Sequence, residues 1–254
     1  MTAARRLYVL TGASRGMGAA MAEQLLAPDH TLLCISRHRS EALAAQAEAL
    51  HAPCEQWALD LSQPAEAAAT LQAWFATLDA APFASAALIN NAAALTRIGP
   101  IDDCTDAELA AALRVGLEAP LLLSAAFLRA TRKWAAEKRV LNISSGLGRR
   151  AMAGQASYCA SKAGIDHLTR AMALDEAGRP NGAKLVALAP GVIDTEMQAH
   201  LRAGDERGFP DKANFVGLKD KGQLTSPTDA AARVLAYLAR ADFGSNVVAD
   251  AREP

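Results

Sequence analysis

The sequence lacks any marked excess of charge of either sign. Its 26 lysines and arginines nearly balance 27 aspartates and glutamates in 254 residues. Proteins that bind nucleic acids or anionic membranes often carry a strong basic excess, so the balance gives no indication of either partner. We therefore expect a small-molecule ligand. A chain of this length buries an ample core without disulfides or metal ions to stabilise it.

Cysteine and histidine are few and scattered. The cysteines form no C-x-x-C pair, which suits a reducing compartment and incidental thiols better than a disulfide framework; they are Cys34, Cys54, Cys104 and Cys159. The histidines show neither H-E-x-x-H nor a close Cys/His spacing; they are His30, His38, His51, His167 and His200. The sequence therefore predicts no metal site.

Long hydrophobic runs are also lacking. The start, "MTAARRLYVL", has two arginines but too short an apolar run for the core of a signal peptide. The longest apolar stretch, "PLLLSAAFL" at 120–128, is far shorter than the roughly 20 residues that cross a bilayer. We expect a cytoplasmic protein.

The sequence does have a regular alternation of short apolar runs and longer alanine-rich segments, which is typical of βαβ units. The apolar runs predict strands at 6–10, 31–36, 54–59, 86–90, 138–144, 183–188 and 245–249. The segments between them predict helices at 16–27, 40–50, 64–78, 105–136, 157–177 and 227–239. Near-continuous apolar strands indicate a parallel sheet with helices on both faces. We predict one α/β domain, 1–254, with a Rossmann-type doubly wound sheet of about seven strands.

One long irregular stretch interrupts this pattern at about 204–226, and it is rich in Gly, Lys and Asp. Such a segment in a compact domain is more often functional than idle, so we interpret 196–226 as a substrate lid. A disordered surface loop is the alternative. Apolar contacts to a substrate would come from residues whose alternative role is packing: Met152, Met197, Phe209 and Phe215.

The stretch "LTGASRGMG" at 10–18 has two interpretations. It contains G-x-S-x-G, the turn that exposes a nucleophilic Ser14 in hydrolases. That turn follows several strands and an oxyanion loop, whereas residues 1–10 leave room for a single strand. The alternative is a glycine turn that leads into a helix whose N-terminus binds a pyrophosphate. The strand, turn, helix and strand within residues 7–36 favour this second interpretation, in which Ser14 donates a hydrogen bond to a phosphate or ribose.

Three motifs together resemble one known family. "TGASRGMG" in the first turn, "INNAA" at the fourth strand and "YCASK" after the fifth have the order and spacing of the short-chain dehydrogenase/reductase family. The resemblance covers nearly the full length, and it implies a Rossmann fold with a nicotinamide cofactor. It places these residues against the cofactor: Gly12, Ser14, Arg15, Gly16, Met17, Gly18, Asp60, Leu61, Asn91, Ala92, Pro190, Gly191, Ile193 and Thr195. Ala93 stands where the family usually has a glycine.

The end of the second predicted strand bears on which nicotinamide is bound. An acidic side chain there accepts a hydrogen bond from the 2′-hydroxyl of NAD. The sequence "CISRHRS" has no carboxylate and instead has Ser36, Arg37 and Arg39, with Arg15 in the glycine turn. Guanidinium groups suit a 2′-phosphate, so we predict NADP(H). For Arg39, a solvated basic loop is the alternative.

Tyr158 and Lys162 are four residues apart at the start of a predicted helix and so share one face. Carbonyl reduction creates an alkoxide that needs a proton from an acid able to take it back. A phenol, with a pKa of about 10, serves near neutral pH when a cation stabilises the phenolate. The resemblance makes Tyr158 the acid/base and places both residues beside the cofactor. It also assigns Ser145, thirteen residues before Tyr158, to the substrate oxygen, ahead of Ser144.

The sequence departs from the family at Gly116, where the resemblance predicts an asparagine that holds a water linking the lysine to solvent. Pro120 has no N–H, so it leaves the carbonyl of Gly116 without its helical partner. Our hypothesis is that this carbonyl holds the relay water instead. An impaired enzyme is the alternative.

Beyond these motifs, "VIDTEMQAHLRAG", "FVGLKDKGQLTSP" and "FGSNVVADAREP" are similar to the sepiapterin reductase and benzil reductase branch. The similarity implies an NADPH-dependent reductase for a vicinal dicarbonyl or a ring-bearing ketone. A catalytically silent NADP-binding regulator or scaffold and a serine hydrolase acting through Ser14 are the alternatives. The family's pairing of its long central helices implies a homodimer, with a tetramer as the alternative.

Overall fold

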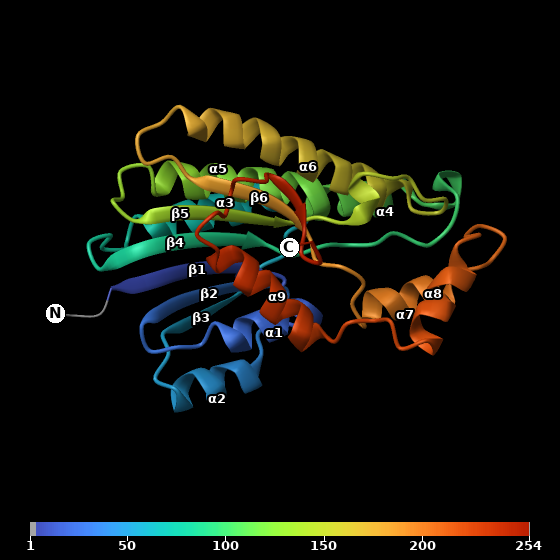
Figure 1. The fold of residues 1–254 in the computed structure, drawn as a ribbon, viewed down its shortest axis with the longest axis horizontal. Coiled ribbons are helices and arrows are strands. Elements are labelled where there is room, and N and C mark those ends of the chain that lie inside the picture. Colours follow the sequence, from blue (N-terminus) through green and yellow to red (C-terminus); the bar gives the residue numbers. More distant parts are fainter. Residues whose placement is uncertain (1–3, 254) are drawn as a thin grey trace.

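The structure is a computed structural model that describes residues 4–253. A parallel sheet of seven strands, in the order β3-β2-β1-β4-β5-β6-β7, forms the middle layer (Figure 1). Its strands are β1 (Arg5–Thr11), β2 (His30–Ser36), β3 (Cys54–Ala58), β4 (Phe83–Asn90), β5 (Glu137–Ile143), β6 (Lys184–Ala189) and β7 (Val248–Asp250). The predicted Rossmann-type fold is therefore confirmed. The strand order reverses between β1 and β4, and open sheets bind ligands beyond the carboxyl ends of the strands at such a point.

Helices cover both faces of the sheet (Figure 1). They are α1 (Gly16–Gln24), α2 (Glu41–Ala49), α3 (Pro64–Phe75), α4 (Asp106–Leu113), α5 (Ala119–Ala130), α6 (Ala156–Ala177), α7 (Glu196–Ala203), α8 (Lys212–Asp220) and α9 (Pro227–Ala239). One face carries α1, α2 and α9, and the other carries α3, α4, α5 and α6. Apart from 105–136 and the lid, the bounds of the predicted elements differ from the observed ones by at most three residues.

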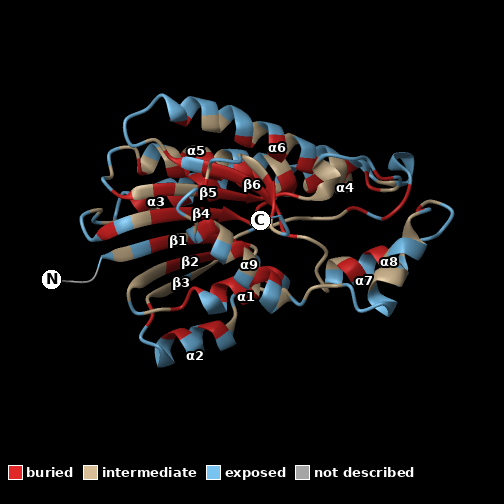
Figure 2. Ribbon diagram, viewed as in Figure 1, coloured by how far each residue is buried: buried red, intermediate tan, exposed pale blue. Residues whose placement is uncertain are grey.

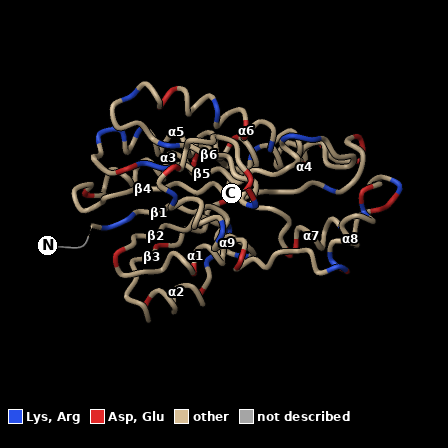
Figure 3. Tube along the Cα trace, viewed as in Figure 1, with Lys and Arg blue, Asp and Glu red and all other residues tan. Residues whose placement is uncertain are grey.

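Most of the buried residues lie in the strands and on the sheet-facing sides of the helices (Figure 2). One apolar cluster joins the sheet to α1, α2 and α9, and a second joins it to α3 and α5. Leu10, Leu88, Leu141 and Val186 are fully buried in central strands, as expected for a sheet covered on both faces. Basic and acidic residues are interspersed along the chain in Figure 3.

The single helix predicted at 105–136 is wrong in its middle and at its end. Residues Arg114–Glu118 form a π turn between α4 and α5, and the N–H of Ala119 bonds to the carbonyl of Arg114, five residues back. Pro120, at the start of α5, cannot donate the next helical hydrogen bond, which favours this wider turn. The helix ends at Ala130, and the hydroxyl of Thr131 donates to the carbonyl of Phe127 at 2.8 Å.

The segment Asp106–Ala130 is long and apolar enough, by length and composition, to cross a membrane. Half of its most apolar window is buried inside the fold, however. Leu123 and Phe127 of α5 are fully buried in the cluster shared with α3 and the sheet. The segment therefore has the character of a core helix.

The stretch predicted to be irregular at 204–226 is also partly wrong, because it contains α8. Phe209, just before this helix, is fully buried, and its ring lies 5.5 Å from that of Phe215 in α8. Together with Ile98, Met152 and Leu201 these rings form a small apolar cluster of their own. The many charged residues obscured this apolar pairing in the sequence.

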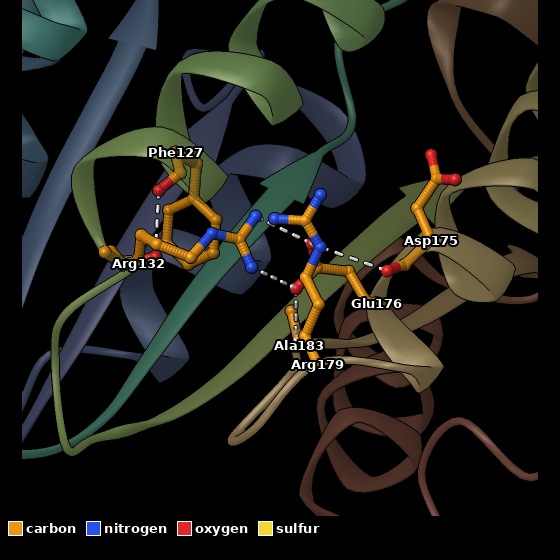
Figure 4. Close-up of polar contacts among 7 residues, drawn as sticks. Phe127, Arg132, Asp175, Glu176, Arg179 and Ala183 are labelled. Carbon is orange, nitrogen blue, oxygen red and sulfur yellow. Dashed lines mark hydrogen bonds and ion pairs between the residues drawn. The ribbon is translucent and has the colours of Figure 1, made fainter.

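A buried ion-pair cluster closes the amino end of the sheet, away from the carboxyl ends of the strands (Figure 4). The carboxylate of Glu176, in α6, is 2% exposed and accepts two hydrogen bonds from Arg132, at 2.8 and 2.9 Å. It also accepts from the backbone N–H of Ala183 at 3.0 Å, and Arg179 lies 3.6 Å away. These contacts tie the end of α6 to the segments before β5 and β6.

Candidate functional site

A cavity of about 1220 Å³ opens beyond the carboxyl ends of the strands. Its wall is built from the segments that follow β1 to β6, together with parts of α6, α7 and α8. Every residue that the sequence assigned to cofactor binding or catalysis lies on this wall, whereas Arg39 does not. Residues from distant parts of the chain thus meet at the place where the strand order reverses.

The turn after β1 has glycine where no side chain fits. Gly12 has a φ of +70°, and a Cβ on it would lie 2.9 Å from the Cα of Ala92. A Cβ on Gly18 would lie 2.0 Å from the carbonyl oxygen of Gly12. Helix α1 begins at Gly16, and no side chain caps its N-terminus. The open turn and the uncapped helix N-terminus fit the pyrophosphate of a dinucleotide.

The amide of Asn91 fastens this turn to the end of β4. Its Nδ2 donates to the carbonyls of Thr11 and Gly12, at 3.0 and 3.2 Å. The hydroxyl of Thr11 in turn accepts from the backbone N–H groups of Asn91 and Ala92, at 2.9 and 3.0 Å. Ala93, which replaces the family's glycine, does not have a positive φ, so alanine is unstrained there.

Two arginines stand on the wall near the start of α1 and the end of β2. The side chains of Arg15 and Arg37 are exposed, and no carboxylate follows β2 directly. Arg15 forms an ion pair with Glu196 at the start of α7, which connects the glycine turn to the segment 196–226. The pKa of Asp60, after β3, lies below its usual range because it accepts hydrogen bonds from Ser62, and the charge of Arg37 adds to this effect.

Ser145, Tyr158 and Lys162 meet deeper in the cavity. Ser145 follows β5, and its hydroxyl accepts a hydrogen bond from the N–H of Leu147 at 3.2 Å. The ammonium group of Lys162 lies 5.5 Å from the centre of the Tyr158 ring and donates to the carbonyl of Ile143 at 2.7 Å. The first turns of α6 therefore direct both side chains toward the end of β5, as their spacing predicts.

Burial shifts the pKa values of this pair in opposite directions. It lowers the pKa of Lys162 to about 8, and the negative charge of Asp166 acts against that shift. Burial raises the pKa of Tyr158, while a hydrogen bond with Ser145 acts in the opposite direction. Desolvation disfavours both the ammonium and the phenolate, so each depends on nearby charges and hydrogen bonds. Such paired shifts are typical of acid/base sites.

Several polar residues on the cavity wall were not predicted from the sequence. Gln155 is buried in the residue before α6, and Gln198 and His200 lie on α7. Gln155 could have been predicted to line the cavity, because it lies three residues before Tyr158 and thus on the same side of the helix. Gln198 and His200 could not, because their position depends on how α7 packs. Arg150 and Arg252 also line the cavity.

The apolar lid candidates divide into two groups. Met152, Met197 and Phe215 lie on the cavity wall. Phe209 is fully buried in the lid's own cluster and does not line the cavity, so its role is packing. The cavity thus combines apolar side chains with a few amides and charged groups, as is usual for small-molecule sites.

Gly116, in the π turn, packs directly against the helix that carries Lys162. A Cβ at this position would lie 3.0 Å from both the Cβ and the hydroxyl oxygen of Ser161. Ser161 is itself buried, and its hydroxyl donates to the carbonyl of Tyr158 at 2.9 Å. The space that the family's asparagine requires is therefore taken by α6.

We expect Gly116→Ala to lower the thermal unfolding temperature and Gly116→Asn to lower it further, because the added atoms push against α6. Overpacking typically costs about 1–3 kcal/mol, which exceeds the gain of up to about 1 kcal/mol from removing a helical glycine. Gly217→Ala in α8 is the matched control, since nothing lies within 4 Å of its added Cβ. It should raise the unfolding temperature slightly. An unfolding temperature for Gly116→Asn equal to that of the wild type contradicts the prediction.

Within residues 4–253, no cluster of three or more His, Cys, Asp or Glu side chains has an arrangement that could hold a metal ion. The four cysteines are free thiols. The wall of the cavity carries hydroxyl, phenol, amine and guanidinium groups.

Comparisons with known proteins agree with this geometry. A family model described as short chain dehydrogenase matches residues 6–206. Benzil reductase ((S)-benzoin forming) of Bacillus cereus is 33% identical over 238 residues, covering 94% of this chain and 96% of the relative. Sepiapterin reductase of Xenopus laevis is 30% identical over 256 residues, covering 94% of each. The crystal structure of a metagenomic short-chain oxidoreductase in complex with NADP has a TM-score of 0.69 and 26% identity, over 96% of this chain and 94% of that one.

Proposed function

The chain belongs to the short-chain dehydrogenase family of oxidoreductases, and we propose that it is an NADPH-dependent carbonyl reductase that converts a ketone or vicinal dicarbonyl to an alcohol. The observation that carries the proposal is the meeting of Ser145, Tyr158 and Lys162 in the cavity that also holds the glycine turn. That arrangement puts a phenol in the same cavity as the glycine turn, which supports the proposal. The reaction is proposed to take place in the cytoplasm.

Residues on the cavity wall are proposed to hold the nicotinamide cofactor. We propose that the N-terminus of α1 and the hydroxyl of Ser14 bind the phosphates, while Asn91 and Lys162 lie at the nicotinamide ribose. Ile193 and Thr195, which line the cavity after β6, would hold the carboxamide of the nicotinamide. Gly12 and Gly18 allow the tight packing of the turn that shapes this site, because a Cβ on either would meet backbone atoms of the protein. When bound, the reduced nicotinamide supplies the hydride.

Three residues are proposed to carry out the proton transfer. Ser145 donates a hydrogen bond to the carbonyl oxygen of the substrate and orients it. Tyr158 donates its phenolic proton to that oxygen as the negative charge develops. Lys162, whose ammonium group faces the ring, stabilises the phenolate that remains. Tyr158 is then reprotonated from solvent. We propose that a water bound to the carbonyl oxygen of Gly116 relays this proton.

We propose NADPH rather than NADH because of the charges at the end of β2. Arg15 and Arg37 stand on the cavity wall, and the segment has no carboxylate to accept from a 2′-hydroxyl. Guanidinium groups pair well with a phosphate dianion. The NADP-bound structure of a family member supports the same choice.

We propose a substrate with a second polar group beside its reactive carbonyl. Met152, Met197 and Phe215 are apolar residues of the cavity wall, and Gln155 adds an amide to the lining of the same cavity. Such a pocket suits an aryl diketone, and the similarity to benzil reductase over 94% of this chain supports that class.

A silent NADP-binding regulator or scaffold is the second candidate. Gly116 favours it, since the family's asparagine is absent and α6 occupies its space. Such a protein would bind NADPH but never oxidise it in the presence of diketones, quinones or pterins.

We propose that the protein forms a homodimer, with a tetramer as the alternative. Leu113 and Leu121, at the end of α4 and in α5, are 40% and 41% exposed, and Leu174 of α6 is 78% exposed. These leucines lie on the two long central helical segments, where a second copy would cover them.

The test is the rate of NADPH and NADH oxidation with a panel of aryl diketones, quinones and pterins. We expect reduction of at least one diketone, with a higher kcat/KM for NADPH than for NADH.

Arg37→Ala should raise the KM for NADPH about tenfold and leave that for NADH nearly unchanged, because one charged hydrogen bond to the phosphate is lost.

Arg39→Ala is the matched control, because it removes the same charge from the same loop outside the cavity. It should leave both KM values near those of the wild type. A wild-type preference for NADH would overturn the cofactor assignment.

A further inference from the structure

A buried carboxylate lies one helical turn beyond Lys162. Asp166 of α6 is 2% exposed and takes no part in the mechanism above. The hydroxyl of Ser144, at the end of β5, donates a hydrogen bond to its Oδ1. Its Oδ2 lies 3.5 Å from Nε of Arg149 and has no hydrogen-bond partner. Burying a carboxylate is costly, so its retention beside the site calls for a role.

The turn that follows Ser145 rests directly on this carboxylate. A Cβ on Gly148 would lie 2.9 Å from Oδ2 of Asp166 and 2.9 Å from the carbonyl oxygen of Lys162. The glycine therefore lets the 3₁₀ turn Gly146–Gly148 lie against α6 at the level of both residues. Ser144, the turn that follows Ser145 and the backbone of Lys162 thus form one packed unit with Asp166.

The charged groups around this unit come from four elements. Tyr158 faces Lys162 from the same helix, and Arg149 faces Asp166 from the turn after β5. Arg149 also donates to the carbonyl of Ala249 in β7 at 2.9 Å, and its charge reaches Asp250, which pairs with Arg252. The charged residues of the π turn, Arg114 and Glu118, are exposed to solvent. Asp166 thus supplies a buried negative charge whose Coulombic effect reaches Lys162.

That charge opposes the desolvation of Lys162. Burial lowers the pKa of this amine to about 8, and Asp166 acts to raise it. Without the carboxylate the pKa of Lys162 would fall further toward neutrality, because the negative charge that offsets part of the desolvation would be gone. A neutral lysine no longer stabilises a phenolate.

We propose that Asp166 is a positioning residue of the reductase, which keeps Lys162 in its ammonium form and, through Ser144, holds the end of β5 that carries Ser145. The proposal rests on the function proposed above. The charge of Asp166 and its hydrogen bond can be tested separately, because Asp166→Asn removes the charge and keeps an acceptor for Ser144.

The first test needs no substrate. Protein labelled with ¹³C at the ε carbon of lysine is titrated by NMR, and the signal of Lys162 is assigned by its loss in Lys162→Arg. In Asp166→Asn we expect the midpoint of Lys162 to fall by about half a pH unit or more. Asp175→Asn, which removes an exposed carboxylate from the same helix, should leave the midpoint unchanged.

The second test is the pH profile of carbonyl reduction. The alkaline limb, where the proton of the Tyr158 and Lys162 pair is lost, should move to lower pH in Asp166→Asn by the same amount. Arg149→Met should move it to higher pH, because the carboxylate is then less neutralised. Arg149 is partly exposed, so this variant tests the charge role even where Asp166→Asn folds poorly.

The outcomes separate the two proposals. A Lys162 midpoint that is the same in Asp166→Asn and the wild type, with Arg149→Met also unchanged, overturns the role of Asp166. A wild-type protein that reduces no carbonyl overturns the proposed function, whatever the NMR titration shows. Ser144→Ala should keep the midpoint at the wild-type pH, since it removes the hydrogen bond but no charge.

Discussion

Tyr158→Phe is expected to lower kcat for carbonyl reduction by about 100-fold or more while Kd for NADPH stays within a few fold of the wild type. The variant removes one hydroxyl and keeps the ring that faces the ammonium group of Lys162. General acid catalysis typically contributes about 10²–10⁴-fold, and among residues 4–253 no other phenol lies on the cavity wall. Steady-state kinetics give kcat, and a fluorescence titration with NADPH gives Kd.

Tyr237→Phe is the matched control for this variant. Tyr237 lies on α9, outside the cavity, with its ring against the guanidinium group of Arg240. The same oxygen is removed, yet kcat should remain at the wild-type value. If Tyr158→Phe retained most of the wild-type kcat, another group would have to supply the proton, and the role given to Tyr158 would be wrong.

Glu176→Ala is expected to destabilise the fold by about 2–3 kcal/mol. Its carboxylate is 2% exposed and accepts from Arg132 and from the N–H of Ala183. Removing one partner of a buried pair typically costs about 3–5 kcal/mol. We reduce that figure because Arg132 is 33% exposed and can be rehydrated. For a chain of this size the unfolding temperature should fall by about 5–10 °C.

The stability lost when Glu176 is replaced should depend on pH in a defined direction. Burial acts to raise the pKa of Glu176, but the hydrogen bonds from Arg132 and Ala183 and the nearby guanidinium charges outweigh it and hold the pKa below its usual range. A group whose pKa is depressed in the folded state contributes stability above its unfolded pKa, about 4.3 for glutamate. That contribution is lost as the pH falls through the folded value. The neutral variant Glu176→Gln tests this dependence. Its deficit in the free energy of unfolding, relative to the wild type, should be full at pH 7 and should shrink below about pH 4.

Thermal unfolding at pH 7 and at about pH 3.5 measures this dependence. Asp242→Ala is the control, because it breaks the exposed pair with Arg240 and should leave the unfolding temperature near that of the wild type. The cluster lies at the amino end of the sheet, so Glu176 variants should keep wild-type KM values where they are folded (Figure 4). An equal deficit at both pH values would contradict the ionised state of Glu176.

Local pattern was enough to predict much of the framework. The alternation of apolar runs and amphipathic segments predicted all seven strands, and α9 has the predicted bounds, residues 227–239. These features depend on neighbours a few residues apart, which the sequence displays directly. The glycine turn and the spacing of Tyr158 and Lys162 are likewise short-range, and the structure brings these residues to one cavity.

Other features depend on contacts between distant segments. The π turn at Arg114–Glu118 lies just before Pro120 and packs Gly116 against α6, whereas the periodicity of the sequence predicts one continuous helix there. Helix α8 escaped prediction because its stabilising contact, Phe209 with Phe215, lies within a charge-rich stretch.

The sequence by itself determined the class of fold, the glycine turn and the helix that presents Tyr158 and Lys162, because each depends on residues close together in the chain. Tertiary structure alone decided which side chains share the cavity with them. Asp166 meets Ser144 across 22 residues, and Arg15 meets Glu196 across 181. Contacts over such separations exist only once the sheet has brought its carboxyl ends together, so no local pattern predicts them.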